Sequence, residues 1–381
     1  MFSDFIVQEY LEDINDLAAI TAKQKKKPIV VFGCGGAGRE VTELLSKHGL
    51  QVEAYCEGEK YWREGKSFLE RPVLLVNDVP GEYSEATLII SATGPEILDS
   101  ISMFKKIEGY TVLGYVGRNQ LYTMNSEWIV QHKKELGNTF DLLEDEESRL
   151  VFLSYLGARA NCIRREDTVP LINLWKSRQY FNELYPVELF KEHILIDCGA
   201  WIGDTAEAFI RFIGEKKPHA LVRAFEMEDD NYKALLNVAE RFKGQIIPYR
   251  CGVGDRKETL YFEKNSDASV IVDYETDNKV EILPVDDILN GEERKASFVK
   301  MDLEGYERNA LLGMRNLVNT NLPMLAVCVY HKIDDLIVMP ELIRKMEKES
   351  PLYPKKRYRY YLRHHSHNAS ELVFYAVPVD A

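Results

Sequence analysis

Short apolar runs recur throughout the second half of the chain, separated by segments whose apolar residues repeat at helical spacing. Seven of these runs are predicted strands. They span residues 193–199, 221–226, 245–254, 297–305, 324–331, 358–365 and 371–377. Strands that alternate with helices predict a parallel sheet with right-handed crossovers, whereas the last two runs lie close enough in sequence to pair antiparallel. The pattern therefore predicts an α/β unit built on a seven-stranded, mostly parallel sheet.

The first half of the chain shows the same alternation on a smaller scale. Strands are predicted at 28–33, 50–56, 73–79, 86–92 and 110–116, and helices at 4–22, 37–49 and 95–108. This pattern predicts a second, smaller Rossmann-like α/β domain over residues 1–120. Residues 121–190 lack strand signals and are predicted to form a helical connector that packs on the main domain, residues 191–381. Within the main domain, three β-rich segments between 258 and 285 are expected to form an inserted hairpin or extension.

Composition narrows the classes of function. The 381 residues suit two domains, and the net charge of −13 argues against nucleic-acid partners and anionic membrane surfaces. The acidic N-terminus does not resemble a secretory signal, and no apolar run is long enough to span a membrane, so we expect a cytoplasmic protein. The six cysteines form no CxxC pair, which argues against a zinc or disulfide framework. The oligomeric state stays open, a homo-oligomer included.

Residues 194–205, ILIDCGAWIGDT, have the pattern of a buried strand that turns through glycine into a helix. Gly199 and Gly203 would let a cofactor approach the backbone closely, and the helix N-terminus would favour a carboxylate. An adenosine-containing cofactor also needs an acid at the end of the next strand for its ribose, and Glu226 has this spacing. Asp197 could bind an ammonium group directly or through water. The alternative is a turn that merely packs strand on helix. The predicted cofactor-binding residues of this turn are Asp197, Gly199, Gly203, Asp204 and Glu226.

Four motifs in this half follow one another in the order seen in the FkbM family of methyltransferases. They are residues 194–205, 224–238, 297–314 and 325–343, and the similarity extends over about 140–378. The resemblance implies the class I methyltransferase fold, S-adenosylmethionine as the cofactor, and methyl transfer to oxygen. Trp201 departs from the family pattern, which leads us to expect a smaller or more polar residue. We expect its indole to pack under the turn rather than to stack near cofactor or substrate.

The chemistry of methyl transfer directs attention to the strand ends near Asp302 and His331. Because a hydroxyl is a poor nucleophile at neutral pH, a nearby base helps, and His331 is the predicted base. Asp302 could orient His331, contact the cofactor, or help to hold a metal ion, but two ligands are too few to predict a metal site. Lys300 would be costly to bury alone, so Asp302 or Glu304 is expected to compensate it. Glu304 and Glu307 lie at a predicted helix start, which favours acids.

A second glycine turn lies near the start of the chain. Gly33, Gly35 and Gly38 satisfy the GxGxxG pattern between a predicted strand and helix, and Glu57 follows at a spacing suited to a ribose. The domain resembles nucleotide-binding domains attached to some sugar-modifying acyltransferases, which implies a nucleotide ligand. A purely packing role is the alternative. An independent nicotinamide-dependent dehydrogenase is less favoured, because no hydride-transfer residue set is evident.

These observations predict an S-adenosylmethionine-dependent O-methyltransferase acting on a hydroxyl of a sugar, glycan or other small molecule. Two alternatives stay open. One is a sugar-modifying protein that uses NAD(P) or a sugar nucleotide in the first domain. The other is a non-catalytic module that senses nucleotides.

Overall fold

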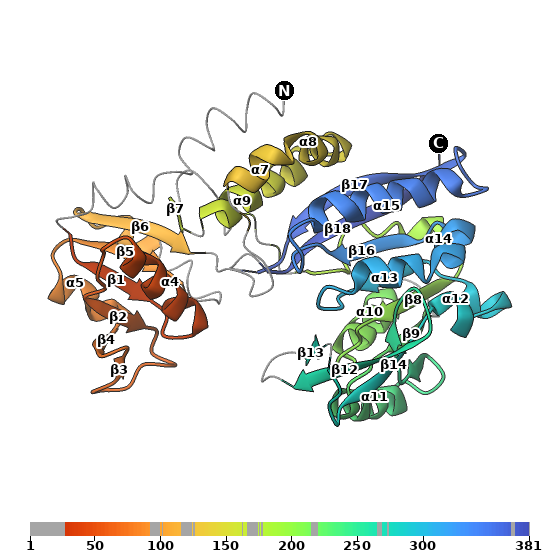
Figure 1. Cartoon of the computed structure of the whole chain (residues 1–381), viewed down its shortest axis with the longest axis horizontal. Helices are drawn as coiled ribbons and strands as arrows, with labels where there is room; N and C mark the ends of the chain where they lie inside the picture. Colours follow the sequence, from red (N-terminus) through yellow and green to blue (C-terminus); the bar gives the residue numbers. More distant parts are fainter. Residues whose placement is uncertain are drawn as a thin grey trace. The chain divides into compact units, whose positions relative to one another are not determined.

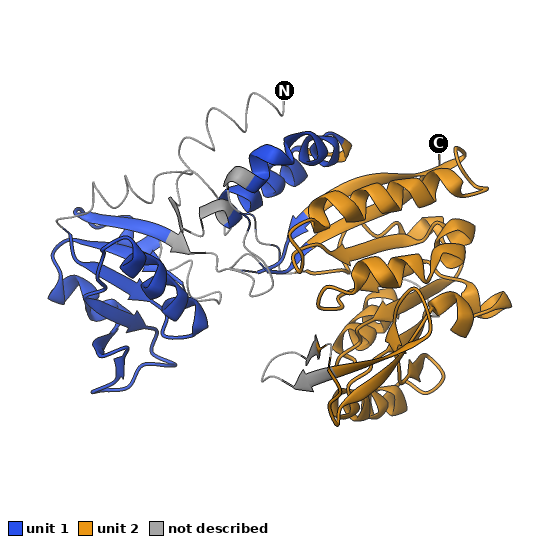
Figure 2. Cartoon of the chain, in the orientation of Figure 1, with its two compact units in different colours: residues 1–141, 146–176, 363–372 blue, residues 142–145, 177–362, 373–381 orange. Residues whose placement is uncertain are grey.

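The computed structural model divides into two compact units. Unit 1 contains residues 1–141, 146–176 and 363–372, and unit 2 contains 142–145, 177–362 and 373–381 (Figure 2). The residues described are 27–91, 100, 102–115, 124, 126–161, 163–165, 174, 176, 178–214, 220–264, 269–272, 274–366 and 370–380. The predicted helix at 4–22 lies outside the described residues, and the one at 95–108 lies partly outside them. In the part of the chain that is described, no helix has the length and apolar character needed to cross a membrane.

Unit 1 is built on a seven-stranded sheet in the order β3-β4-β2-β1-β5-β6-β7. The strands are β1 (Ile29–Phe32), β2 (Ala54–Glu57), β3 (Ser67–Phe68), β4 (Arg71–Leu75), β5 (Ala86–Ile90), β6 (Tyr110–Tyr115) and β7 (Ile163–Arg165). The five predicted strands are β1, β2, β4, β5 and β6, and they pair in parallel. The short edge strands β3 and β7 pair antiparallel with β4 and β6.

Helices of unit 1 include α4 (Gly36–Lys47), α5 (Val79–Glu82), α7 (Ser126–Gln131), α8 (Lys133–Leu142) and α9 (Glu146–Asn161). In its described residues, the predicted connector contains helices α7, α8 and α9, and also strand β7, which the sequence pattern did not indicate. The apolar core lies on both faces of the sheet. Ile29 and Val31 face one buried cluster, and Val30 and Phe32 face another. This alternation explains why strand β1 reads as an unbroken apolar run.

Unit 2 is built on a seven-stranded sheet in the order β10-β9-β8-β15-β16-β18-β17 (Figure 1). Its strands are β8 (His193–Cys198), β9 (Ala220–Phe225), β10 (Ile246–Tyr249), β15 (Phe298–Met301), β16 (Met324–Cys328), β17 (Lys356–His364) and β18 (Leu372–Asp380). Strands β10, β9, β8, β15 and β16 are parallel, and β18 pairs antiparallel with β16. The predicted seven-stranded, mostly parallel sheet of class I methyltransferase type is confirmed.

The helices of unit 2 are α10 (Asp204–Gly214), α11 (Asp229–Arg241), α12 (Val285–Ile288), α13 (Glu307–Leu312), α14 (Arg315–Asn321) and α15 (Asp335–Glu349). The predicted β-rich extension forms a separate four-stranded sheet in the order β11-β14-β12-β13. Its strands are β11 (Gly252–Val253), β12 (Glu258–Lys264), β13 (Ser269–Val272) and β14 (Lys279–Leu283).

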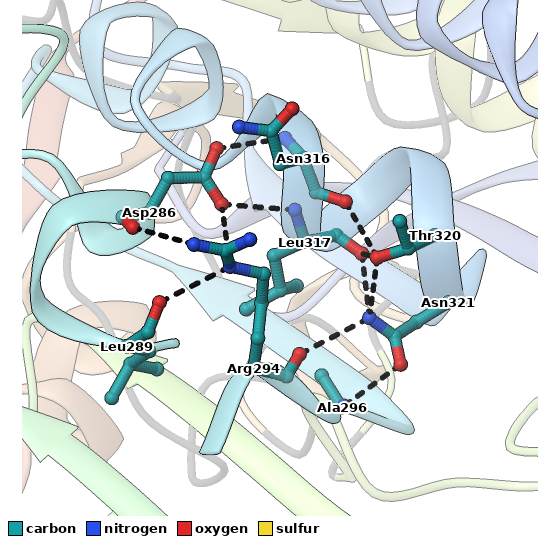
Figure 3. A network of polar contacts seen from close by, with 8 residues as sticks. All are labelled: Asp286, Leu289, Arg294, Ala296, Asn316, Leu317, Thr320 and Asn321. Carbon is teal, nitrogen blue, oxygen red and sulfur yellow. Dashed lines mark hydrogen bonds and ion pairs between the residues drawn. The ribbon is translucent and has the colours of Figure 1, made fainter. Parts of the chain in front are cut away.

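A polar network fixes the amino end of strand β15 (Figure 3). The Asp286 carboxylate accepts hydrogen bonds from the backbone N–H groups of Asn316 (2.7 Å) and Leu317 (3.0 Å), and so caps helix α14 from a distant segment. Arg294 donates to the Asp286 carbonyl, and Asn321 at the end of α14 donates to the Arg294 carbonyl. Residues 286–296, which lead into β15, are therefore hydrogen-bonded to both the start and the end of helix α14.

Candidate active site

The predicted site residues of unit 2 follow four neighbouring parallel strands at their carboxyl ends. Strand β8 lies between β9 and β15, and β16 lies beside β15. Asp197 belongs to the end of β8, Glu226 follows β9, Asp302 follows β15, and His331 follows β16. Because parallel strands end at the same edge of the sheet, one edge carries all four side chains.

The backbone of the turn after β8 requires its glycines. Gly199 has a φ of +81°, and a Cβ atom there would overlap the carbonyl oxygen of Asp302. Gly203 has a φ of +86°, and a Cβ atom would lie 2.9 Å from Leu235. Close packing and left-handed backbone therefore both demand glycine. Asp204 is the exposed first residue of helix α10, where a carboxylate interacts favourably with the helix dipole.

Glu226 closes the turn. Its two carboxylate oxygens accept hydrogen bonds from the backbone N–H groups of Trp201 and Glu228, both at 2.8 Å. Burial raises the pKa of Glu226 above its usual range, against the lowering effect of these two N–H groups. Each oxygen keeps a second lone pair that can accept a further donor. Trp201 itself is 55% exposed, so the prediction that its indole packs under the turn is wrong. The left-handed backbone at Trp201, with a φ of +46°, accompanies this outward position.

Asp197 is fully buried, and neither of its carboxylate oxygens has a hydrogen-bond partner among the residues that are described. Its charge is balanced by Lys300, whose Nζ lies 3.4 Å from Oδ1 and donates to the Gly199 carbonyl at 2.6 Å. Burial raises the pKa of Asp197 to about 6, although Lys300 acts in the opposite direction. Lys300 was predicted to be compensated by Asp302 or Glu304. Its ion pair is with Asp197, because the register of β8 and β15 places the two residues opposite each other, while the Asp302 charge also favours protonated Lys300 and raises its pKa.

Two tyrosines contact Asp302. The Tyr180 hydroxyl donates to Oδ2 at 3.3 Å, and the Tyr330 hydroxyl lies 3.5 Å from Oδ1. The Tyr180 ring also lies over Lys300, with Nζ 5.6 Å from the ring centroid. Sequence reasoning did not identify either tyrosine as a site residue. Tyr180 has a left-handed φ of +61°. The only available signal for it was its place within residues 140–378, which resemble the FkbM family.

His331 is buried among carboxylates. Its Nε2 lies 3.6 Å from Asp302 Oδ1 and 3.6 Å from Glu304 Oε2, and its Nδ1 lies 2.8 Å from Glu307 Oε1. Burial alone would lower the pKa of His331, but the three carboxylates, Glu307 foremost, raise it to about 9. An imidazole with this pKa is protonated at neutral pH and must lose its proton before it can act as a base.

Glu304 and Glu307 differ in their environments. Glu307 is the first residue of helix α13, as predicted, but its carboxylate is buried and accepts the Leu303 N–H, so it is more than a solvated acid at a helix start. Glu304 precedes the helix, and its side chain is 55% exposed. Its φ of +51° is unusual for a residue with a side chain. The atoms of Asp302, Glu304 and His331 that could bind a metal lie within 4.8 Å of one another.

The glycine turn of unit 1 joins β1 to helix α4. Gly33 has a φ of +120°, and a Cβ atom on Gly38 would overlap the Gly33 carbonyl oxygen, so both glycines serve close packing. At Gly35 and Gly36 a Cβ atom would meet nothing within 4 Å. Glu57 at the end of β2 forms an ion pair with Lys66. The carboxylate proposed for a ribose is therefore already engaged by a cation.

Comparisons with known proteins bear on unit 2 most directly. Residues 197–350 match the model of the methyltransferase FkbM domain. The hexuronic acid methyltransferase AglP of Haloferax volcanii is 28% identical over 156 residues, which are 39% of this chain and 62% of that protein's length. The solved structure of a methyltransferase FkbM from Methylobacillus flagellatus covers 98% of this chain and 97% of its own, with 19% identity and a TM-score of 0.68. At that identity it supports the fold alone. Residues 197–350 therefore match the methyltransferase FkbM domain, and the sheet order of unit 2 agrees with a methyltransferase fold.

Proposed function

We propose that the protein transfers the methyl group of S-adenosylmethionine to a hydroxyl oxygen of a sugar or related small molecule. The oxygen attacks the methyl carbon, and the electrons of the breaking carbon–sulfur bond pass to sulfur. The products are a methyl ether, S-adenosylhomocysteine and the proton of the hydroxyl. The observation that carries the proposal is the fully buried Asp197 carboxylate, which has no hydrogen-bond partner among the described residues and forms an ion pair with Lys300. It lies one strand from the Glu226 carboxylate, which can accept further hydrogen bonds.

Each part of the cofactor has a matching group at this edge of the sheet. Asp197 would compensate the ammonium of the methionine tail, directly or through water, because a buried carboxylate gains most from a cation. The N-terminus of the eleven-residue helix α10 would favour the tail carboxylate. Glu226 would accept hydrogen bonds from the ribose hydroxyls through its two remaining lone pairs. The turn at Gly199 and Gly203 would let the cofactor lie against the backbone.

The acceptor would bind beside Asp302, whose side chain is 25% exposed. The sulfonium is already reactive, so the protein mainly has to align the acceptor oxygen with the methyl group and exclude water. We expect Asp302 and His331 to lie close to the hydroxyl when its proton is released. The curated relative is named a hexuronic acid methyltransferase, which supports an acidic sugar as the acceptor class.

We also propose that unit 1 binds a nucleotide. The open backbone at Gly35 and Gly36, the N-cap and first residue of helix α4, supports this, because the packing contact that demands Gly38 does not reach them. Calorimetry with a uridine diphosphate sugar and with NAD would separate a sugar-nucleotide site from a dinucleotide site. If neither ligand binds, the glycine turn of unit 1 serves only to pack strand β1 against helix α4.

The function is tested with the purified full chain. Mass spectrometry of incubations with S-adenosylmethionine and glucuronic acid glycosides should show S-adenosylhomocysteine and an acceptor heavier by one methylene. Binding of the cofactor without any turnover on a panel of sugars would instead support a sensing module. Co-purified NAD with no affinity for S-adenosylmethionine would support the nicotinamide-dependent alternative.

A further inference from the structure

Three potential metal ligands converge at the ends of β15 and β16. His331 Nε2 lies 3.6 Å from Asp302 Oδ1 and 3.6 Å from Glu304 Oε2. These separations are too long for hydrogen bonds. They agree with the spacing of about 3.5 Å expected between two ligands that each lie about 2.1 Å from one ion at a tetrahedral angle. The three side chains therefore bring one imidazole nitrogen and two carboxylates within 4.8 Å of one another.

The imidazole of His331 presents its Nε2 to Asp302 and Glu304. His331 is 1% exposed, and its Nε2 has no hydrogen-bond partner among the described residues. On the other side of the ring, Nδ1 lies 2.8 Å from Glu307 Oε1, and the same oxygen accepts the Leu303 N–H at 2.8 Å. A carboxylate behind the ring is the usual arrangement for a histidine that binds metal, because it fixes the tautomer and directs the other nitrogen to the ion.

The third potential ligand, Glu304, lies on strained backbone. Glu304 has a left-handed φ of +51°, and the following Gly305 has a φ of +96°. Strain of this kind persists where the surroundings demand it and is common at functional sites. With this backbone, Glu304 Oε2 lies 3.6 Å from His331 Nε2. The Tyr330 hydroxyl lies 3.5 Å from the same Asp302 Oδ1, and the Tyr180 hydroxyl donates to Oδ2 at 3.3 Å.

We propose that Asp302, Glu304 and His331 bind a divalent first-row transition ion, such as Mn²⁺ or Zn²⁺. One imidazole nitrogen with two carboxylates suits these ions better than Mg²⁺ or Ca²⁺, which prefer oxygen ligands throughout. Three protein ligands leave coordination positions open. The Glu304 side chain is half-exposed, so the cluster is accessible from solvent next to this residue. His331 is buried, so the cluster is closed next to the imidazole.

The ion would give the acceptor hydroxyl its reactivity, a role that rests on the proposed methyl transfer. A bound divalent cation lowers the pKa of a coordinated hydroxyl and orients its oxygen. The proton would then pass to water, and His331 would serve as a ligand rather than as the base. The proposed cofactor residues Asp197 and Glu226 belong to other strands, β8 and β9. Cation binding and cofactor binding can therefore be measured separately.

The test uses the full chain, stripped with EDTA and dialysed. Titration with Mn²⁺ by calorimetry should give one saturable site, and pulsed electron paramagnetic resonance should show nitrogen coupling from an imidazole. Glu304→Gln should weaken Mn²⁺ binding at least tenfold, and His331→Gln should abolish the nitrogen coupling. The matched control is Glu341→Gln, an exposed glutamate on α15, which should bind Mn²⁺ like the wild type.

Affinity for S-adenosylmethionine, measured on the same samples, shows whether each variant is folded and separates the two proposals. Wild-type protein that binds S-adenosylmethionine but shows no saturable Mn²⁺ site would overturn the cation site alone. Equal Mn²⁺ affinity in Glu304→Gln would do the same, and would make the cluster a protonated histidine held by three acids. Saturable Mn²⁺ binding without any affinity for S-adenosylmethionine would instead overturn the proposed function.

Discussion

Replacing Glu226 with glutamine removes one charge and one acceptor at the proposed ribose site while keeping the shape of the side chain. In the structure, each carboxylate oxygen accepts one backbone N–H, from Trp201 or Glu228. A glutamine amide can accept only one of these two bonds, and its NH₂ group would face the other donor. The variant therefore loses a backbone contact of the turn as well as a partner for the cofactor.

The expected loss of cofactor affinity follows from these contacts. Hydrogen bonds to a charged group contribute about 1.5–3 kcal/mol each, and the wild-type carboxylate offers one free lone pair per oxygen to the ribose hydroxyls. Glutamine would keep at most one of these bonds, and without the charge. We expect S-adenosylmethionine binding to weaken by about 2–3 kcal/mol, or roughly 30- to 150-fold in Kd.

Calorimetry with S-adenosylmethionine and with S-adenosylhomocysteine measures this loss, and both ligands should lose affinity equally because both carry the ribose. Glu240→Gln, an exposed residue of helix α11, is the matched control and should bind both ligands like the wild type. Circular dichroism would verify that Glu226→Gln is folded. A folded Glu226→Gln protein with unchanged affinity for both ligands would refute the ribose role of Glu226.

Three further predictions concern the same edge of the sheet. Because burial holds the pKa of Asp197 at about 6 and a cationic cofactor tail favours its ionised form, S-adenosylmethionine affinity should fall about tenfold per pH unit below 6 in calorimetry; a flat profile would contradict this. Lys300→Met leaves Asp197 buried without its counter-ion and should lower stability by about 3–5 kcal/mol in urea unfolding, whereas an unchanged midpoint would show that the pair is dispensable. Gly199→Ala should yield little folded protein by circular dichroism, since its Cβ overlaps a backbone oxygen; a native spectrum would disprove that constraint.

The sheet of unit 2 was predictable because each strand carries its own signal. Strands such as β8 and β16 are buried along their whole length, so their sequences are continuous apolar runs that end at polar residues. Parallel pairing then places Asp197, Glu226, Asp302 and His331 at one edge without further information. Strand β7 was missed because three residues at a sheet edge, IRR, carry too little apolar pattern to be distinguished from a loop.

Partners across strands were harder to predict, because they depend on register and on the height of a side chain above the sheet. Lys300 shares a strand with Asp302, but pairing of β15 with β8 places it opposite Asp197. Glu307 was assigned to a helix start, and its burial against His331 becomes evident only when α13 is placed beside the loop after β16. Tyr180 comes from a segment with little regular structure, so periodicity gave no sign of its contact with Asp302.

The outward position of Trp201 gives the protein a natural fluorophore at the rim of its proposed cofactor site. The indole is 55% exposed to water, while the backbone of the same residue is bonded to Glu226. A ligand held by that glutamate would lie near the Trp201 backbone, so we expect tryptophan emission to respond to its binding. Occupancy of the site can be followed through tryptophan emission in unlabelled protein, which offers an inexpensive screen for acceptors and inhibitors.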